Sequence, residues 1–559
     1  MKKIGEILVN MGIITDRQLK EAVIESKKNG EMLGKVLINM GYLAEDQLLK
    51  ALSKQLDIPY VSSLKGLEIS EQVIKAVPVK IVWHYKFMPL SINGEVLKLA
   101  ISNPHEIWSA EDIKLLLGYN TEIVLVPTKE IMEAIRKYYG IGAETVQKIL
   151  EKKEPGKKTE QDKDKDTKDI ENSSGEASVI KLVDQIFLSA IKSDATDIHF
   201  ENYRNSVKIR CRVDGILCDM ALPQDIKLLY PAIVSRVKII SGLDVVEKRI
   251  PQDGRVKIKF QENSIDLRVS VIPVQNGENI VIRILPNELT LNTADLGFYE
   301  KDFETLKRLI HLPTGVIFLA GPTGSGKSTT LYACLSEIRS PDTKIITVED
   351  PIEYEMDDIM QIQIQPKVGL TFASSLRSIL RHDPDIIMVG EVRDKETADL
   401  AIRSALTGHL IFSTLHTNDA SSGISRLIDM GIEPFLLVSS VKAFIAQRLV
   451  RVNCSKCSKK QNVSGFSAIH NIPVKTYLKG EGCDACGNTG YKGRTAIHEL
   501  FVLEKELQEM VLKKASNAEL KQKAREMGMR TLRENGWEKV KEGVTTIEEV
   551  LRVTDADDE

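Results

Sequence analysis

The chain has 559 residues, of which 42% are hydrophobic and 28% are charged. At about 150 residues per domain, this length predicts several independent cores and excludes a single small module. The 76 basic and 79 acidic residues nearly cancel, so nucleic acid is not expected as a partner. No run of about 20 apolar residues marks a membrane span, and polar residues interrupt the N-terminus where a secretory signal would be apolar. We therefore expect a cytoplasmic protein.

An internal repeat opens the chain. Residues 3–26 and 32–55 align at an offset of 29 positions, with identical residues at eight pairs of positions that include Gly5 and Gly34. Each copy is typical of a short amphipathic helix, a glycine, and a second helix with acidic residues in its first turn. The repeat predicts two copies of one helical hairpin. With a small α/β part, the hairpins are expected to form an N-terminal regulatory or docking domain over residues 1–150.

Composition then divides the rest of the chain. Residues 151–178 are dense in both charges and almost free of apolar side chains, which predicts a flexible charged linker. An amphipathic helix and alternating strands follow, and they predict a second N-terminal α/β domain over 179–290. The remaining expectations are a large α/β domain over 291–452, a four-cysteine segment over 453–498 and a C-terminal helical region over 499–559.

The most specific motif starts at Gly321, where the sequence GPTGSGKS matches the phosphate-loop pattern G-x-x-x-x-G-K-[ST]. An apolar run precedes it and a helix-compatible run follows it, as a phosphate loop requires. Glycines let backbone N–H groups approach phosphate oxygens, Lys327 reaches the β and γ phosphates, and Ser328 can coordinate Mg²⁺. The alternative is a chance glycine-rich turn. The residues expected to contact nucleotide here are Gly321, Pro322, Thr323, Gly324, Ser325, Gly326, Lys327, Ser328 and Thr329.

Acidic residues follow two further apolar runs. The run KIITV precedes Glu349, Asp350 and Glu353, and the run PDIIMV precedes Gly390 and Glu391. Because the carboxyl ends of strands line the ligand crevice of an open parallel sheet, these acids are expected to converge near the phosphates. One carboxylate can hold Mg²⁺ while another orients or deprotonates the attacking water. The alternative for each is to cap the next helix or to form an ion pair.

Two histidines and two arginines are further candidates for this site. His409 and His416 flank a third apolar run and could touch phosphate or relay its state, or could serve only in packing. Arg255 and Arg268 lie between the linker and the phosphate loop. Planar guanidinium groups stabilise phosphate charge, so one or both could reach the γ-phosphate of ATP. The alternative is ordinary surface arginines.

Four of the seven cysteines form two C-x-x-C pairs, Cys454 with Cys457 and Cys483 with Cys486. Two thiolate pairs can hold one tetrahedral ion, and zinc fits best. The 25 residues between the pairs are tolerable, since doubling a loop costs only about 0.6 kcal/mol. The alternative is four free buried thiols. With all four positions ligated, the zinc would be structural rather than catalytic.

Together these motifs resemble the secretion ATPase superfamily that powers type IV pilus assembly and type II secretion, the PilB/GspE family. The text GPTGSGKSTT resembles its Walker A motif, ITVEDPIEY its aspartate box, DPDIIMVGEVRD its Walker B region and ALTGHLIFSTLHTNDA its histidine box. TDIHFE, RVDG and RIPQDGR resemble its second N-terminal domain. The paired cysteines and GYKGRTAIHEL resemble the metal-binding segment of the pilus-extension and secretion branches.

The resemblance implies an α/β fold in which a RecA-like P-loop ATPase core follows a smaller PAS-like α/β domain and a helical-repeat N-terminal domain. It implies a hexameric motor at the inner face of the cytoplasmic membrane, which hydrolyses ATP with Mg²⁺ and drives type IV pilus assembly through an inner-membrane platform protein and other cytoplasmic components. The alternatives are a type II secretion ATPase and a nucleotide-gated scaffold without turnover. By the same resemblance Glu391 would serve the Mg²⁺ site, Glu353 would position or activate water, and Arg255 with Arg268 would clasp the γ-phosphate.

The front repeat is similar to the cyclic di-GMP-binding N-terminal domain of some of these ATPases. Each motif of that domain begins with arginine, and here Lys3 and Met32 stand at those positions. Met32 cannot reproduce the stacking and forked hydrogen bonds of arginine, and Lys3 can do so only in part. Cyclic di-GMP binding and docking of a membrane partner are therefore the two hypotheses for this domain.

Overall fold

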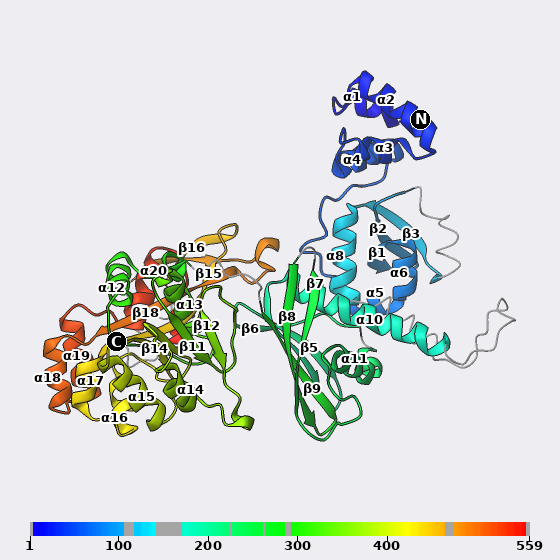
Figure 1. Cartoon of the computed structure of the whole chain (residues 1–559). Helices are drawn as coiled ribbons and strands as arrows, with labels where there is room; N and C mark the ends of the chain where they lie inside the picture. Colours follow the sequence, from blue (N-terminus) through cyan, green and yellow to red (C-terminus); the bar gives the residue numbers. More distant parts are fainter. Residues whose placement is uncertain are drawn as a thin grey trace. The chain divides into compact units, whose positions relative to one another are not determined.

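The computed structural model describes residues 4–104, 117–140, 170–223, 225–260, 263–285, 292–463 and 474–554. The chain forms two compact units, Met1–Leu285 and Pro286–Glu559 (Figure 1). Most of the predicted linker, up to residue 169, lies outside the described residues.

The first four helices form the predicted pair of helical hairpins. Thr15 caps the N-terminus of the second helix through a capping box with Gln18, which satisfies two backbone N–H groups. A Cβ on Gly5 would lie 2.6 Å from Leu19 Cδ1, and one on Gly34 would lie 2.8 Å from Leu48 Cδ2. The repeated glycine therefore lets the two helices of each hairpin pack closely. The helices are α1 (Ile4–Asn10), α2 (Asp16–Asn29), α3 (Leu33–Asn39) and α4 (Glu45–Leu56).

A small α/β part follows the hairpins. Its sheet has the order β1-β2-β3, with β1 antiparallel and β3 parallel to β2. Its core is built around buried residues such as Phe87, Leu97 and Ile135. The elements are α5 (Glu71–Ala76), α6 (Val79–Tyr85), β1 (Met88–Asn93), β2 (Val96–Ile101), β3 (Asn120–Leu125) and α8 (Thr128–Tyr139).

A six-stranded antiparallel sheet, in the order β6-β5-β4-β9-β8-β7, forms the second N-terminal domain. Helices α10 and α11 cover one face through a core that includes Ile186, Ile233 and Ile282. Helix α10 begins at Ile170, so its first residues lie in the segment predicted as linker. The sequence did not reveal this start, because the polar residues there show no helical period of apolar side chains. The elements are α10 (Ile170–Lys192), β4 (Ala195–Asn202), β5 (Val207–Val213), β6 (Ile216–Asp219), α11 (Ile226–Ile240), β7 (Gln252–Phe260), β8 (Asn263–Val274) and β9 (Gly277–Leu285).

The C-terminal unit contains a seven-stranded sheet in the order β12-β11-β13-β14-β10-β15-β18. All neighbours pair in parallel except β18, which is antiparallel to β15. The strands are β10 (Gly315–Ala320), β11 (Ile345–Glu349), β12 (Met360–Gln363), β13 (Ile386–Val389), β14 (Leu410–Leu415), β15 (Val441–Asn453) and β18 (Tyr491–Val502). Four of them, β10, β11, β13 and β14, are buried along their whole length, as expected for a parallel sheet covered on both faces.

Helices cover both faces of this sheet (Figure 1). One face packs against α12 (Glu300–Ile310) and α13 (Lys327–Ile338), which follow the short helix η1 (Thr293–Leu296). The other face packs against α14 (Phe372–Ile379), α15 (Lys395–Leu406), α16 (Ser422–Asp429), α17 (Pro434–Ser440), α18 (Lys505–Leu512) and α19 (Asn517–Glu526). Among the helices that the structure describes, none has the length and apolar character of a membrane-crossing segment.

The cysteine segment is an insertion between two paired strands of this sheet. Strands β15 and β18 enclose it, so the predicted boundaries at 452/453 and 498/499 fall inside these strands. Sequence patterning could not reveal this, because the pairing joins strands that are about 40 residues apart. Within the insertion, β16 pairs with β17. Outside it, helices α20 and α21 end the part of the chain that the structure describes. The elements are β16 (Ser458–Asn462), β17 (Thr476–Gly480), η3 (Asp484–Cys486), α20 (Leu532–Lys541) and α21 (Ile547–Val553).

Candidate functional site

The predicted phosphate loop lies between β10 and α13. The buried strand ends at Ala320, and the helix begins at Lys327. Gly324 and Gly326 have φ of +80° and +88°, a conformation that glycine adopts without the strain of a side chain. The Gly321 N–H donates to Leu415 O at 3.3 Å, which places the start of the loop beside the end of β14. Strand, loop and helix therefore follow one another as the motif predicts.

Lys327 lies folded back over the loop. Its Nζ donates to Gly321 O at 2.7 Å and to Pro322 O at 3.0 Å. Burial lowers the pKa of Lys327 to about 8, the Glu391 carboxylate opposes this shift, and the Arg448 charge adds to it. The loop thus presents an ammonium group whose charge is sensitive to pH just above neutrality.

The segments that follow β13 and β14 lie close together at the carboxyl ends of these strands. His416 Nε2 lies 2.8 Å from Glu391 Oε1, and Arg393 donates to Glu391 Oε2 at 2.6 Å. The Glu391 side chain is 16% exposed, and its carboxylate interacts electrostatically with Lys327. The structure therefore gathers Lys327, Glu391 and His416 into one cluster, as expected for acids and histidines at the carboxyl ends of parallel strands.

Glu349, at the end of β11, has its hydrogen-bond partners within the protein. It is 4% exposed, and it accepts from the Tyr332 hydroxyl, from Thr347 Oγ1 at 2.5 Å and from Gln361 Nε2 at 3.1 Å. Its predicted contact with nucleotide stays a prediction. Burial, with the Glu349 charge, raises the pKa of Tyr332. The same hydroxyl accepts from the Glu353 N–H at 3.2 Å. Glu349 therefore anchors the segment after β11 to α13.

The other two acids predicted after β11 are more accessible. Asp350 is exposed, and Glu353 is half-buried with its backbone held by Tyr332. Both follow the carboxyl end of β11, which pairs in parallel with β13 through Val348 and Val389. They therefore lie on the side of the sheet where the Glu391 cluster lies.

His409 lies at the opposite edge of the sheet. It precedes β14, and Gly315, the first residue of β10, donates its N–H to His409 O at 3.1 Å. The phosphate loop follows the other end of β10, about 16 Å away at 3.3 Å per residue. His409 therefore lies at the end of β14 that is away from the phosphate loop of its own chain, and its predicted catalytic role stays a prediction.

Sequence reasoning missed two residues of β15, one that contacts the loop and one that contacts the segment after β14. Gln447 Nε2 donates to Ser325 O at 2.9 Å, and Gln447 Oε1 accepts from Thr330 Oγ1 at 2.7 Å. Arg448 donates to Asn418 O at 2.6 Å, within the segment after His416. The signal was a Gln-Arg pair inside the apolar run VKAFIAQRLV, because a polar side chain buried in a strand needs a partner.

The two predicted arginines lie on the second N-terminal domain. Arg255 of β7 is directly opposite Arg268 of β8, which is directly opposite Arg283 of β9. Arg283 donates to Asp197 of β4 at 3.1 Å. Arg268 alternates with the buried Leu267, so this row crosses the face that α10 and α11 leave uncovered. The structure thus joins both predicted arginines to a third that sequence reasoning did not select.

The four cysteines of the two pairs come together. Their sulfur atoms all lie within 4.8 Å of one another, with Cys454–Cys483 at 3.7 Å and Cys457–Cys486 at 3.8 Å. A tetrahedral zinc ion with Zn–S bonds of about 2.3 Å requires sulfurs about 3.8 Å apart. Although burial opposes it, the backbone N–H groups of Cys483 and Gly490 help lower the pKa of Cys486 to about 6. The donor set therefore fits structural zinc.

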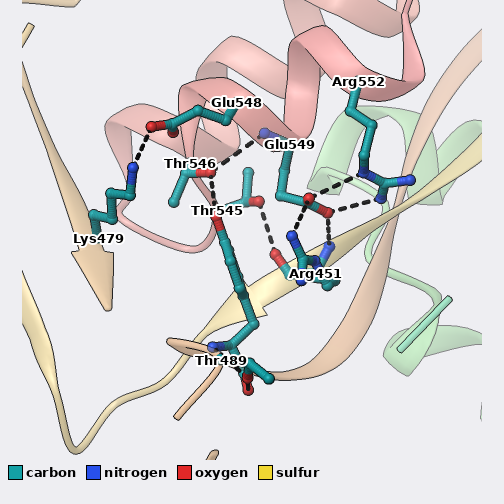
Figure 2. A network of polar contacts seen from close by, with 9 residues as sticks. Arg451, Lys479, Thr489, Thr545, Thr546, Glu548, Glu549 and Arg552 are labelled. Carbon is teal, nitrogen blue, oxygen red and sulfur yellow. Dashed lines mark hydrogen bonds and ion pairs between the residues drawn. The ribbon is translucent and has the colours of Figure 1, made fainter. Parts of the chain in front are cut away.

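A polar network docks the cysteine segment and β15 on α21 (Figure 2). Glu549, 1% exposed, accepts from Arg451 Nη2 at 2.7 Å and from Arg552 Nη2 at 2.8 Å. Lys479 of β17 forms an ion pair with Glu548. These contacts attach the C-terminal helix to the strand that carries Gln447.

Comparisons with known proteins agree with this geometry. The profile of the family described as Type II/IV secretion system protein matches residues 172–552, and that of the MshEN domain matches residues 56–145. The type IV pilus assembly ATPase PilB of Myxococcus xanthus is 40% identical over 564 residues, 99% of each chain. Type II secretion system protein E of Xanthomonas campestris is 40% identical over 86% of this chain and 85% of its own.

A solved structure shows the same fold. The ATPase DotB of Yersinia pseudotuberculosis aligns with a TM-score of 0.50 at 24% identity, over 71% of this chain and 97% of its own. The α/β architecture with a RecA-like ATPase core is confirmed, as is the predicted relationship to the secretion ATPases. The chain therefore belongs to the type II/IV secretion system protein family and is an ATPase motor of the PilB/GspE type.

Proposed function

We propose that this ATPase drives assembly of type IV pili. The observation that carries the proposal is the alignment with a pilus assembly ATPase over nearly the whole of both chains, front domain included. The alternative is the ATPase of a type II secretion system, which relatives of that name support over a shorter part of this chain. Both assignments use the same nucleotide chemistry.

In the proposed mechanism, Lys327 and the backbone N–H groups of the loop bind the β and γ phosphates of ATP. Ser328, exposed at the start of α13, and Glu391 would hold Mg²⁺, which would neutralise phosphate charge. Glu353 would orient the attacking water. His416, hydrogen-bonded to Glu391, would link that carboxylate to the segment after β14.

The arginine row supplies the remaining charge in this proposal. Arg255 is exposed and Arg268 lies directly opposite it, so the two arginines form a strip across neighbouring strands of the sheet. This strip would contact the γ-phosphate when the N-terminal unit closes on a bound nucleotide. Closing and opening in turn would convert hydrolysis into movement.

The proposal includes an assembly and a place of action. As the family resemblance implies, the chain would work as a homo-hexamer at the cytoplasmic face of the inner membrane. It would act there on a platform protein, together with other cytoplasmic parts of the machine. Zinc at the four cysteines would stiffen the insertion between β15 and β18, since a fully ligated site is structural.

Cyclic di-GMP is the ligand that we propose to test at the front domain. The MshEN match and the retained hairpin repeat support it. Against it, Met32, which is 57% exposed, stands where an arginine would stack on guanine. Docking of a membrane partner is the alternative for this domain.

The test is electron microscopy of surface filaments in a strain that lacks this protein. The strain is complemented with wild type, with Lys327→Ala, or with the control Lys513→Ala, which removes an exposed lysine of the same unit. We expect filaments only with wild type and the control. Filaments that persist without the protein, together with exoproteins retained in the cell, would assign it to secretion. Filaments restored by Lys327→Ala would instead indicate a scaffold without turnover.

A further inference from the structure

We infer that Gln447 is a positioning residue for ATP binding: it holds the peptide between Ser325 and Gly326 in the orientation that the phosphate loop needs. The inference rests on the ATPase activity and is independent of whether the motor serves pili or secretion. It starts from the pairing of β15 with β10. Ala320, the last residue of β10, is opposite Ala446, so β15 continues beside the loop after β10 has ended.

The Gln447 side chain joins three parts of the site. It is 2% exposed, its Nε2 donates to Ser325 O at 2.9 Å, and its Oε1 accepts from Thr330 Oγ1 at 2.7 Å. Ser325 belongs to the loop, and Thr330 is a fully buried residue in the first turn of α13. One amide thus fixes the loop and the helix to β15, and both its oxygen and its nitrogen form hydrogen bonds.

The hydrogen bond to Ser325 O has a directional consequence. In a trans peptide the carbonyl and the N–H point in opposite directions. Holding the Ser325 carbonyl toward β15 therefore directs the Gly326 N–H away from that strand. Gly326 has φ of +88° and ψ of +13°, so the peptide orientation depends on a conformation that glycine tolerates. Phosphate loops bind oxygens with such N–H groups.

The glycines of the motif are fitted to this contact. A Cβ on Gly326 would lie 2.7 Å from Gln447 Nε2. A Cβ on Gly321 would lie 2.8 Å from Gln447 O. Both distances are too short for a real side chain. Two glycines of the loop are therefore needed not only for their backbone angles but also because β15 passes close enough for Gln447 to reach the loop.

The test compares Michaelis constants for ATP. Gln447→Met keeps the length of the side chain and removes both hydrogen bonds, whereas Gln447→Glu keeps an acceptor for Thr330 and loses the donor to Ser325. Thr330→Val removes only the bond to the helix. The control Ile445→Val shortens a buried side chain on the same face of the same strand without touching a polar contact.

For both Gln447 variants we expect KM for ATP to rise about tenfold, with kcat within about threefold of wild type. A tenfold change is about 1.4 kcal/mol, within the cost of leaving one buried carbonyl unpaired. Thr330→Val should raise KM by less than Gln447→Met, and Ile445→Val should leave it unchanged. The dissociation constant of a fluorescent ATP analogue should follow KM.

Wild-type KM in Gln447→Glu would overturn the inference, because that variant has lost the donor to Ser325 and carries an added negative charge beside the loop. An equal rise of KM in Ile445→Val would overturn it too, since the effect would then report general packing of β15. If Gln447→Met does not fold, an unchanged KM in Gln447→Glu still overturns the inference.

Discussion

Affinity for ATP should weaken as the pH rises through 8, because Lys327 loses its proton there. Burial lowers the pKa of Lys327 to about 8, against the opposing charge of Glu391. A group with this pKa is about nine tenths protonated at pH 7 and about one tenth protonated at pH 9. Only the ammonium form binds phosphate well, and apparent affinity scales with the competent fraction. The dissociation constant should therefore rise about tenfold from pH 7 to pH 9.

The assay is titration of a non-hydrolysable ATP analogue at pH 7, 8 and 9 with Mg²⁺ in excess. Lys327→Arg is the matched control, because its guanidinium does not titrate in this range and its binding should change little with pH. Glu391→Gln should move the midpoint of the wild-type curve to lower pH, since the carboxylate raises the Lys327 pKa. A wild-type affinity that is flat up to pH 9, or an equal slope in Lys327→Arg, would refute the reasoning.

Three further predictions concern stability, metal and ligand. Arg552 and Arg451 help hold the pKa of Glu549 at about 2, although burial opposes this shift. A folded-state pKa lowered from 4.5 adds about 3 kcal/mol to the free energy of unfolding. This contribution is present above pH 4.5 and is lost as the pH falls toward 2. Glu549→Gln should lower the free energy of urea unfolding at pH 7 by about that amount, and an unchanged value would contradict the network. Elemental analysis should find one zinc per wild-type chain and less in Cys486→Ser, whereas metal-free wild type would favour free thiols. By calorimetry, Met32→Arg should bind cyclic di-GMP at least tenfold more tightly than wild type, and equal binding would favour docking of a partner.

Sequence patterns were sufficient where a function is local in the chain. The phosphate loop is continuous from strand to helix, so its motif predicted both its residues and its setting. The four cysteines were also foreseeable, because each C-x-x-C pair forms half of a metal site and the hydrophobic fold needs only to bring the halves together.

Sequence patterns did not predict contacts that depend on which strands pair and in which register. Gln447 could not be recognised as a neighbour of the loop before β15 was paired with β10. His416 follows the carboxyl end of β14, but its contact with Glu391 could not be foreseen before β14 was paired with β13. Arg283 joins Arg268 through the β8–β9 pairing, which no local spacing reveals. These features depend on which strands are neighbours, and that is a property of the whole sheet.

The most direct test of the central claim is the number of surface filaments in cells whose only copy carries Glu391→Gln. This variant keeps the shape of the side chain and should still bind ATP, but it lacks the carboxylate proposed to serve hydrolysis. If turnover drives assembly, these cells should carry no filaments although the protein is folded, present at the wild-type level and loaded with nucleotide. Filaments at wild-type density would contradict the account, because they would show that assembly proceeds without the proposed chemistry.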